Sequence, residues 1–136
     1  MLKSDTKGAI VNLNDVNTLF KRDSLFKGIY DLFGLPPSWS RPPGFVSLVK
    51  IILEQQVSLA SAKAHFLKLD TYLSGINPSA ILELSDDEMR ECQMSRQKAV
   101  YLRALSQAIA TEGFSLENLP ALKVQEIRKN LTSIKG

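Results

Sequence analysis

The chain has 136 residues, 44% of them hydrophobic and 23% charged, which is ordinary for one soluble globular domain or part of a larger one. Seventeen basic and fourteen acidic residues give a formal net charge of +3, which permits nucleic-acid binding without demonstrating it. The single cysteine, Cys92, excludes an internal disulfide and a cysteine-based metal cluster, and it fits a reducing compartment. The N-terminus has no apolar signal core, and no stretch approaches the roughly 18 apolar residues of a membrane span. We therefore expect a cytoplasmic protein with no membrane partner.

The first part of the chain predicts two short helices behind a flexible N-terminus. Residues 1–13 show little periodicity, so we expect them to be frayed. Asn14 or Asp15 can cap one short helix, and Asp23 can cap a second. Residues 35–44 contain four prolines, which remove backbone donors and favour extended backbone, so this segment is predicted to be a loop.

Residues 45–53 are almost entirely apolar and predict a central helix that is buried on nearly all sides. Glu54, Gln55 and Gln56 follow this run directly. Buried amides are costly unless they are hydrogen-bonded, so we expect these side chains to lie where the core opens onto a cleft or a ligand. Ser58 is a good N-cap for the next helix.

The rest of the chain also predicts helices. Apolar spacing indicates one helix over residues 59–73, and Asn77 with Pro78 can begin another. Residues 85–88 match the capping box, and Ser95 can cap a longer helix. Apolar side chains recur on one face from Val124 to Ile134. No segment shows the alternation of a strand, so we predict an all-α fold, a compact multi-helix bundle.

Three blocks of the sequence carry a family resemblance: Ile52–Ala64, Met94–Leu102 and Leu131–Gly136. In order and spacing they resemble the helix-hairpin-helix DNA glycosylase superfamily, and within it the DNA-3-methyladenine glycosylase branch, over residues 14–136. The resemblance implies a base-excision DNA repair enzyme that removes alkylated purines such as 3-methyladenine. Such an enzyme flips the base out of double-stranded DNA and hydrolyses its N-glycosidic bond, and it needs no cofactor.

The resemblance implies two DNA-binding regions. Gln56 lies where the family places a side chain that wedges into the duplex and fills the space of the flipped base. From the residues alone, the alternative is that Gln55 and Gln56 only satisfy backbone groups at a helix break. Gly136 corresponds to the first glycine of the hairpin, whose backbone amides bind a DNA phosphate, and Lys135 stands beside it.

The expected DNA-binding set is completed by Ser58, Ser95, Arg96 and Lys98. The family usually has a glycine where this chain has Gln93, in the turn that precedes Ser95. From the residues alone, Arg96 and Lys98 form a solvated basic face. The resemblance to the glycosylases adds the alternative that Arg96 and Lys98 contact DNA phosphates.

No catalytic residue is assigned, because the sequence departs from the family at its end. In the family the last block continues into the second hairpin helix and then to a catalytic Asp, whereas this sequence stops at Gly136. We expect the domain over residues 14–136 to be truncated, inactive alone, and completed by a missing C-terminal half or associated with itself. His65 has no second ligand at metal-binding spacing, so no metal site is predicted. The alternatives are a non-catalytic all-α DNA- or protein-binding module and a remnant that does not fold.

Overall fold

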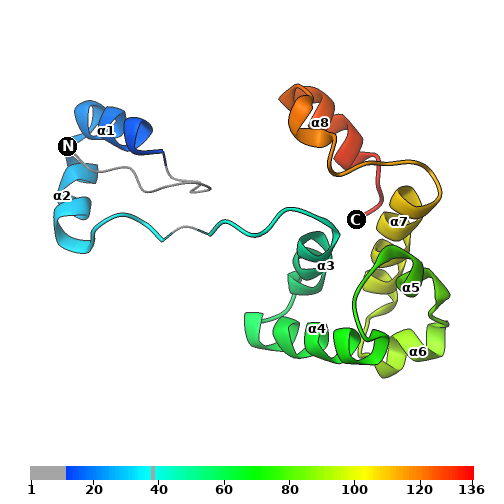
Figure 1. Ribbon diagram of the computed structural model, residues 1–136. Coiled ribbons are helices and arrows are strands. Elements are labelled where there is room, and N and C mark those ends of the chain that lie inside the picture. The colour runs from blue at the N-terminus through cyan, green and yellow to red at the C-terminus, as the bar shows by residue number, and fades with distance from the viewer. Residues whose placement is uncertain (1–11, 38) are drawn as a thin grey trace. The chain divides into compact units, whose positions relative to one another are not determined.

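A computed structural model describes residues 12–37 and 39–136, and every regular element among them is a helix, which confirms the all-α prediction (Figure 1). Residues 1–11, most of the predicted flexible N-terminus, lie outside the described residues. The chain divides into two compact units, Met1–Pro42 and Pro43–Gly136. The elements are α1 (Leu13–Arg22), α2 (Ser24–Phe33), α3 (Phe45–Glu54), α4 (Leu59–Leu73), α5 (Pro78–Glu83), α6 (Asp86–Glu91), α7 (Arg96–Ala110), the 3-10 helix η1 (Leu119–Ala121) and α8 (Val124–Thr132). None of the described helices is both long and apolar enough to span a membrane.

The first unit contains α1 and α2, and each begins at a side-chain cap. The Asn12 side chain accepts a hydrogen bond from the Asn14 N–H at 2.8 Å, so the cap predicted at Asn14 or the next residue is wrong. Helix α1 starts earlier because an amide oxygen can satisfy a backbone donor two residues further on. Asp23 caps α2 as predicted, accepting a backbone N–H at 2.9 Å. The rings of Phe20 and Tyr30 join the two helices, with centroids 5.4 Å apart.

Helix α3 supplies the second unit with core side chains from only one of its faces. Val49 and Leu53 are fully buried at 0% exposure, and Ile52 packs at the edge of the core. Val46 and Ile51 are 39% and 46% exposed, so the prediction that α3 is buried on nearly all sides is wrong. The reason is that α4 and α7 are the helices packed against α3, and they cover one side of it.

The core of the second unit lies where α3, α4, α5, α6 and α7 pack together (Figure 1). The most extensive packing between two helices is that of α5 against α7, and the next is that of α3 against α4. Burial raises the pKa of the Cys92 thiol, so this side chain is a neutral packing group. The buried core residues are Val49, Leu53, Leu69, Ile76, Ile81, Leu84, Met89, Cys92, Met94, Ala99 and Leu102.

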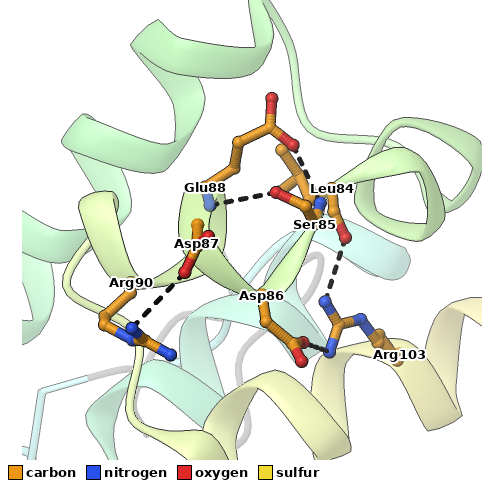
Figure 2. Close-up of polar contacts among 7 residues, drawn as sticks. All are labelled: Leu84, Ser85, Asp86, Asp87, Glu88, Arg90 and Arg103. Carbon is orange, nitrogen blue, oxygen red and sulfur yellow. Dashed lines mark hydrogen bonds and ion pairs between the residues drawn. The ribbon is translucent and has the colours of Figure 1, made fainter.

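Four helices of the second unit begin at the capping side chains predicted for them. The hydroxyls of Ser58 and Ser95 each accept a backbone N–H at 3.2 Å, and the Asn77 side chain accepts one at 2.9 Å. Both bonds of the predicted capping box are present (Figure 2). The Ser85 hydroxyl accepts the Glu88 N–H at 3.2 Å, and the Glu88 carboxylate accepts the Ser85 N–H at 2.8 Å. These local bonds set where α4, α5, α6 and α7 start.

Arg103 on α7 holds the start of α6 (Figure 2). Its guanidinium donates to the Asp86 carboxylate at 2.6 Å and to the Leu84 carbonyl at 2.9 Å, and its side chain is only 30% exposed. Arg90 pairs with Asp87 at 3.4 Å within α6, but both side chains are largely in solvent. The Arg103 contacts therefore position α6, whereas an exposed pair such as Arg90 with Asp87 adds little stability.

Acid should weaken the start of α6 through Glu88. The backbone and hydroxyl of Ser85, and then the hydroxyl of Tyr72, donate to this carboxylate and hold the pKa of Glu88 below its usual value of 4.5. A carboxylate with a lowered folded pKa stabilises the fold above its unfolded pKa, and this contribution is lost as the pH falls through the folded value. We therefore expect the urea midpoint to drop between about pH 5 and about pH 3.

The matched control for this prediction is Glu88→Gln. Glutamine can still accept the Ser85 N–H but cannot titrate, so part of the acid loss should disappear in this variant. An equal loss of urea midpoint in both proteins would show that Glu88 does not contribute to the acid sensitivity.

Helix α8 carries the predicted apolar stripe, and much of that stripe is at the surface. Val124 is 74% exposed and Leu131 is 36% exposed, whereas Ile127 and Ile134 are half-buried. The helix ends at Thr132, two residues before the predicted end of the stripe.

Candidate functional site

The end of α3, the helix α4 and the start of α7 surround one pocket, which we call the glutamine pocket. Its volume is about 510 Å³. Four of its ten lining residues are glutamines, whose amides both donate and accept hydrogen bonds. Five of the eight residues predicted to bind DNA lie in its wall, although they come from three separate parts of the chain. The lining residues are Gln55, Gln56, Val57, His65, Gln93, Ser95, Gln97, Lys98, Tyr101 and Gly136.

The two glutamines of the predicted wedge region form the turn that ends α3. Gln55 has extended backbone, and its N–H donates to the Ile52 carbonyl at 3.3 Å. Gln56 follows with a φ of +61°, in the left-handed region that favours glycine, and its side chain is exposed. Both residues line the pocket, as predicted, whereas Glu54, which was predicted to lie at the same cleft, is not among the lining residues.

A second left-handed glutamine lines the same pocket. Gln93 has a φ of +63°, and its N–H donates to the Arg90 carbonyl at 2.9 Å. The Met94 N–H then donates to the Met89 carbonyl at 3.0 Å and closes the turn after α6. This turn therefore forms with Gln93 where the family resemblance leads one to expect glycine.

Lys98 lies inside the protein, so the solvated basic face predicted for it is wrong. Only 8% of the residue is exposed, and its Nζ donates to the Leu53 carbonyl at 2.6 Å. Carbonyls in the last turn of a helix have no partner within the helix, and the ammonium satisfies one of them at the end of α3. Burial lowers the pKa of Lys98 because it disfavours the charged form. The positions of Arg96 and Lys98 in the sequence predicted that both face solvent. The long apolar stem of a lysine can, however, cross the edge of a core so that its ammonium reaches a carbonyl.

Three predicted DNA-binding residues lie outside the glutamine pocket. Ser58 caps α4, and its hydroxyl accepts a backbone N–H of that helix. Arg96 lines a second pocket of about 510 Å³ together with Arg90 and Arg103. Lys135 lines a third pocket of about 340 Å³, against the C-terminal half of α7. The structure thus assembles part of the predicted set and leaves these three residues at separate places.

The predicted set lacks five of the lining residues, namely Val57, His65, Gln93, Gln97 and Tyr101. The Nδ1 atom of His65 is buried and has no hydrogen-bond partner among the described residues, and nothing in the sequence around it pointed to the pocket. Gln97 donates to the Tyr101 hydroxyl one turn along α7, a spacing that places both on one face of that helix. A methyl group added at Gly136 would meet the Tyr101 ring at 3.5 Å, so this backbone passes close to the ring.

Lys98 brings a cationic side chain to the wall of the glutamine pocket. Among the described residues, no Asp or Glu lines the pocket, and Glu54 lies outside the lining although it directly precedes Gln55. No group of three or more His, Cys, Asp or Glu side chains that could hold a metal ion occurs within residues 12–37 and 39–136. The wall can therefore hydrogen-bond polar or anionic groups through its amides, but it contains no carboxylate to stabilise a cation or activate water.

Comparison with known proteins connects this part of the chain to DNA repair. The family model described as HhH-GPD superfamily base excision DNA repair protein matches residues 49–135. The match includes every lining residue of the glutamine pocket except Gly136. No curated protein matches the sequence.

Two solved structures are similar to the chain in fold. One is a DNA-3-methyladenine glycosidase from Bacillus halodurans, with a TM-score of 0.76 and 24% identity over 99% of this chain. The other is a 3-methyladenine DNA glycosylase from Schizosaccharomyces pombe in complex with abasic DNA, with a TM-score of 0.70 and 21% identity over 90% of this chain. This chain spans 60% of the length of the first protein and 63% of the second.

Proposed function

This chain belongs to the HhH-GPD superfamily of base excision DNA repair proteins. We propose that it functions in a DNA glycosylase and binds damaged duplex DNA at the glutamine pocket. The observation that carries this proposal is the exposed Gln56 in its left-handed turn at the edge of a pocket lined by four glutamines. An enzyme that takes a base out of the stack must fill the vacated space, and unstacking costs about a few kcal/mol. An exposed amide on a rigid turn can enter that space and hydrogen-bond the opposite base.

We assign alkylated purines such as 3-methyladenine as the damaged bases. The two solved structures named above are 3-methyladenine glycosylases by name, and one of them is in complex with abasic DNA. The ligands of this chain would then be duplex DNA with an alkylated base and the abasic duplex left by its removal.

We further propose that these 136 residues bind DNA but do not release the base by themselves. Cleavage of an N-glycosidic bond builds positive charge on the sugar, which a nearby carboxylate stabilises, by the same reasoning that applies to glycoside hydrolysis. Within residues 12–37 and 39–136 no Asp or Glu lines the glutamine pocket, and this observation also favours the second candidate function, a non-catalytic DNA-binding module.

The 136-residue chain should bind duplex DNA with an affinity that falls steeply as salt rises from about 50 mM to about 200 mM. Each phosphate contact contributes a slope of about −0.9 in log K against log salt, so Arg96→Ala should make the slope shallower by about 0.9 if Arg96 meets a phosphate. The measurement is fluorescence anisotropy with labelled duplexes, one intact and one carrying an abasic-site analogue.

Lys68→Ala is the control for charge, because Lys68 is an exposed residue of α4 that does not line the glutamine pocket. Binding that is absent, or independent of salt, would refute the proposed function. Release of 3-methyladenine from methylated DNA above background would refute the claim that these residues do not excise.

A further inference from the structure

One buried contact joins two distant parts of the glutamine pocket. The Lys98 ammonium donates to the Leu53 carbonyl at 2.6 Å across 45 residues of sequence. Both residues are buried, Lys98 at 8% exposure and Leu53 at 0%. Leu53 belongs to the last turn of α3, and Lys98 belongs to the first turn of α7, where Ser95 accepts its backbone N–H. The side chain therefore ties the end of one helix to the start of the other.

The tied carbonyl comes directly before the left-handed turn. In a continuous helix the Leu53 carbonyl would accept the N–H of Val57, but the chain leaves the helix at Gln55 and turns at Gln56 with a φ of +61°. The carbonyl is therefore available to Lys98, and the negative end of the α3 dipole favours a cation there. A non-glycine residue holds a left-handed conformation only where its surroundings determine it, and this contact is one such determinant.

The described partner of the Lys98 ammonium is a backbone carbonyl, that of Leu53. Among the described residues, no carboxylate lines the pocket. Removing the ammonium therefore leaves the Leu53 carbonyl without this donor. A variant at this position tests the tie itself more cleanly than a variant of a buried salt bridge would.

We propose that Lys98 is a positioning residue whose ammonium holds the end of α3 and thereby keeps Gln55 and Gln56 in the conformation that distorts DNA. The proposal rests on the proposed function for its consequence in DNA binding. The contact with Leu53 gives it a second consequence that is independent of DNA. Without the tie, the turn between α3 and α4 becomes mobile while the core helices keep their packing.

The test compares Lys98→Met, which keeps an unbranched apolar stem but removes the ammonium, with Lys68→Met, which removes an exposed ammonium from α4. Hydrogen exchange, followed by NMR, compares the amide of Gln55, which donates to the Ile52 carbonyl at the turn, with those of core residues such as Leu102. Anisotropy measures the ratio of affinities for an abasic and an intact duplex. We expect Lys98→Met to exchange at least about tenfold faster at the turn alone. We expect its preference for abasic DNA to fall several-fold, while Lys68→Met keeps both properties.

Unchanged exchange at the turn, or exchange that rises equally in the core, would overturn the proposal, since the latter shows only general support of the fold. The proposal would also be overturned if Lys98→Met has a mobile turn but still prefers the abasic duplex over the intact one as strongly as the wild type does. If the wild type binds neither duplex, the proposed function fails, and the exchange data still decide whether Lys98 holds the turn. Should Lys98→Met not melt cooperatively, Lys98→Gln replaces it, because its side chain is one atom shorter than that of lysine and carries no charge.

Discussion

Leu53→Ala should lower the free energy of unfolding of the second unit by about 2–5 kcal/mol. Leu53 is 0% exposed and belongs to the core cluster that α3 shares with α4 and α7. Truncation removes buried methyl groups and leaves a cavity, because the surrounding helices close only part of the space. Against a typical total of about 5–15 kcal/mol, such a loss removes a large share of the stability. Hydrogen exchange of buried amides in the whole chain measures it, since these amides exchange through unfolding of the unit.

Ile51→Ala is the matched control on the same helix. Ile51 is 46% exposed, so its truncation removes little buried surface and should cost under about 1 kcal/mol. From the sequence alone the two positions are equivalent members of one apolar run. Similar losses in the two variants would mean that both faces of α3 are covered in solution.

Gln56→Gly should weaken binding to abasic DNA by about tenfold, which corresponds to about 1.4 kcal/mol, while leaving the fold as stable or more stable. The loss is expected because the proposed wedge amide and its hydrogen bonds to the duplex are gone. Equal or higher stability is expected because Gln56 has a φ of +61°. In this left-handed conformation a residue with a side chain is strained by about 1–2 kcal/mol, and glycine is not. Anisotropy with abasic and intact duplexes gives the binding, and a thermal melt gives the stability.

Gln107→Ala is the control for the loss of an exposed glutamine, because Gln107 lies on α7 and does not line the glutamine pocket. It should leave the preference for abasic DNA unchanged. If Gln56→Gly keeps the full preference, Gln56 is not a wedge, and its amide only completes the turn after α3. A variant that loses both stability and binding would instead show that the turn depends on the glutamine side chain itself.

The positions of helix starts could be predicted from sequence because they depend on short-range bonds. Ser58, Asn77, Ser85 and Ser95 each accept a backbone N–H three residues ahead, as their residue types and spacing indicate. The one cap predicted wrongly, in α1, falls on Asn12, two residues before the predicted Asn14. A helix start that depends on a hydrogen bond between residues less than one helical turn apart can thus be predicted from residue type and spacing.

The contents of the candidate site could be predicted only in part. The polar run after α3 correctly indicated a cleft, because buried amides need partners and a break in an apolar helix offers few. His65 and Tyr101 could not be assigned to that cleft, since they come from α4 and α7 and nothing near them in sequence distinguishes a pocket wall from an ordinary helix surface.

The sequence by itself determined the all-α class, the starts of α2, α4, α5, α6 and α7, and the polar break at Gln55 and Gln56. Tertiary structure alone decided which face of α3 is buried and where Lys98 goes. The apolar residues of α3 are spread over nearly all of its sides, so periodicity could not identify the buried face. The packing of α4 and α7 determines which face is buried. The Lys98 ammonium bonds a carbonyl 45 residues away, and no local pattern encodes a contact that exists only after the two helices have packed.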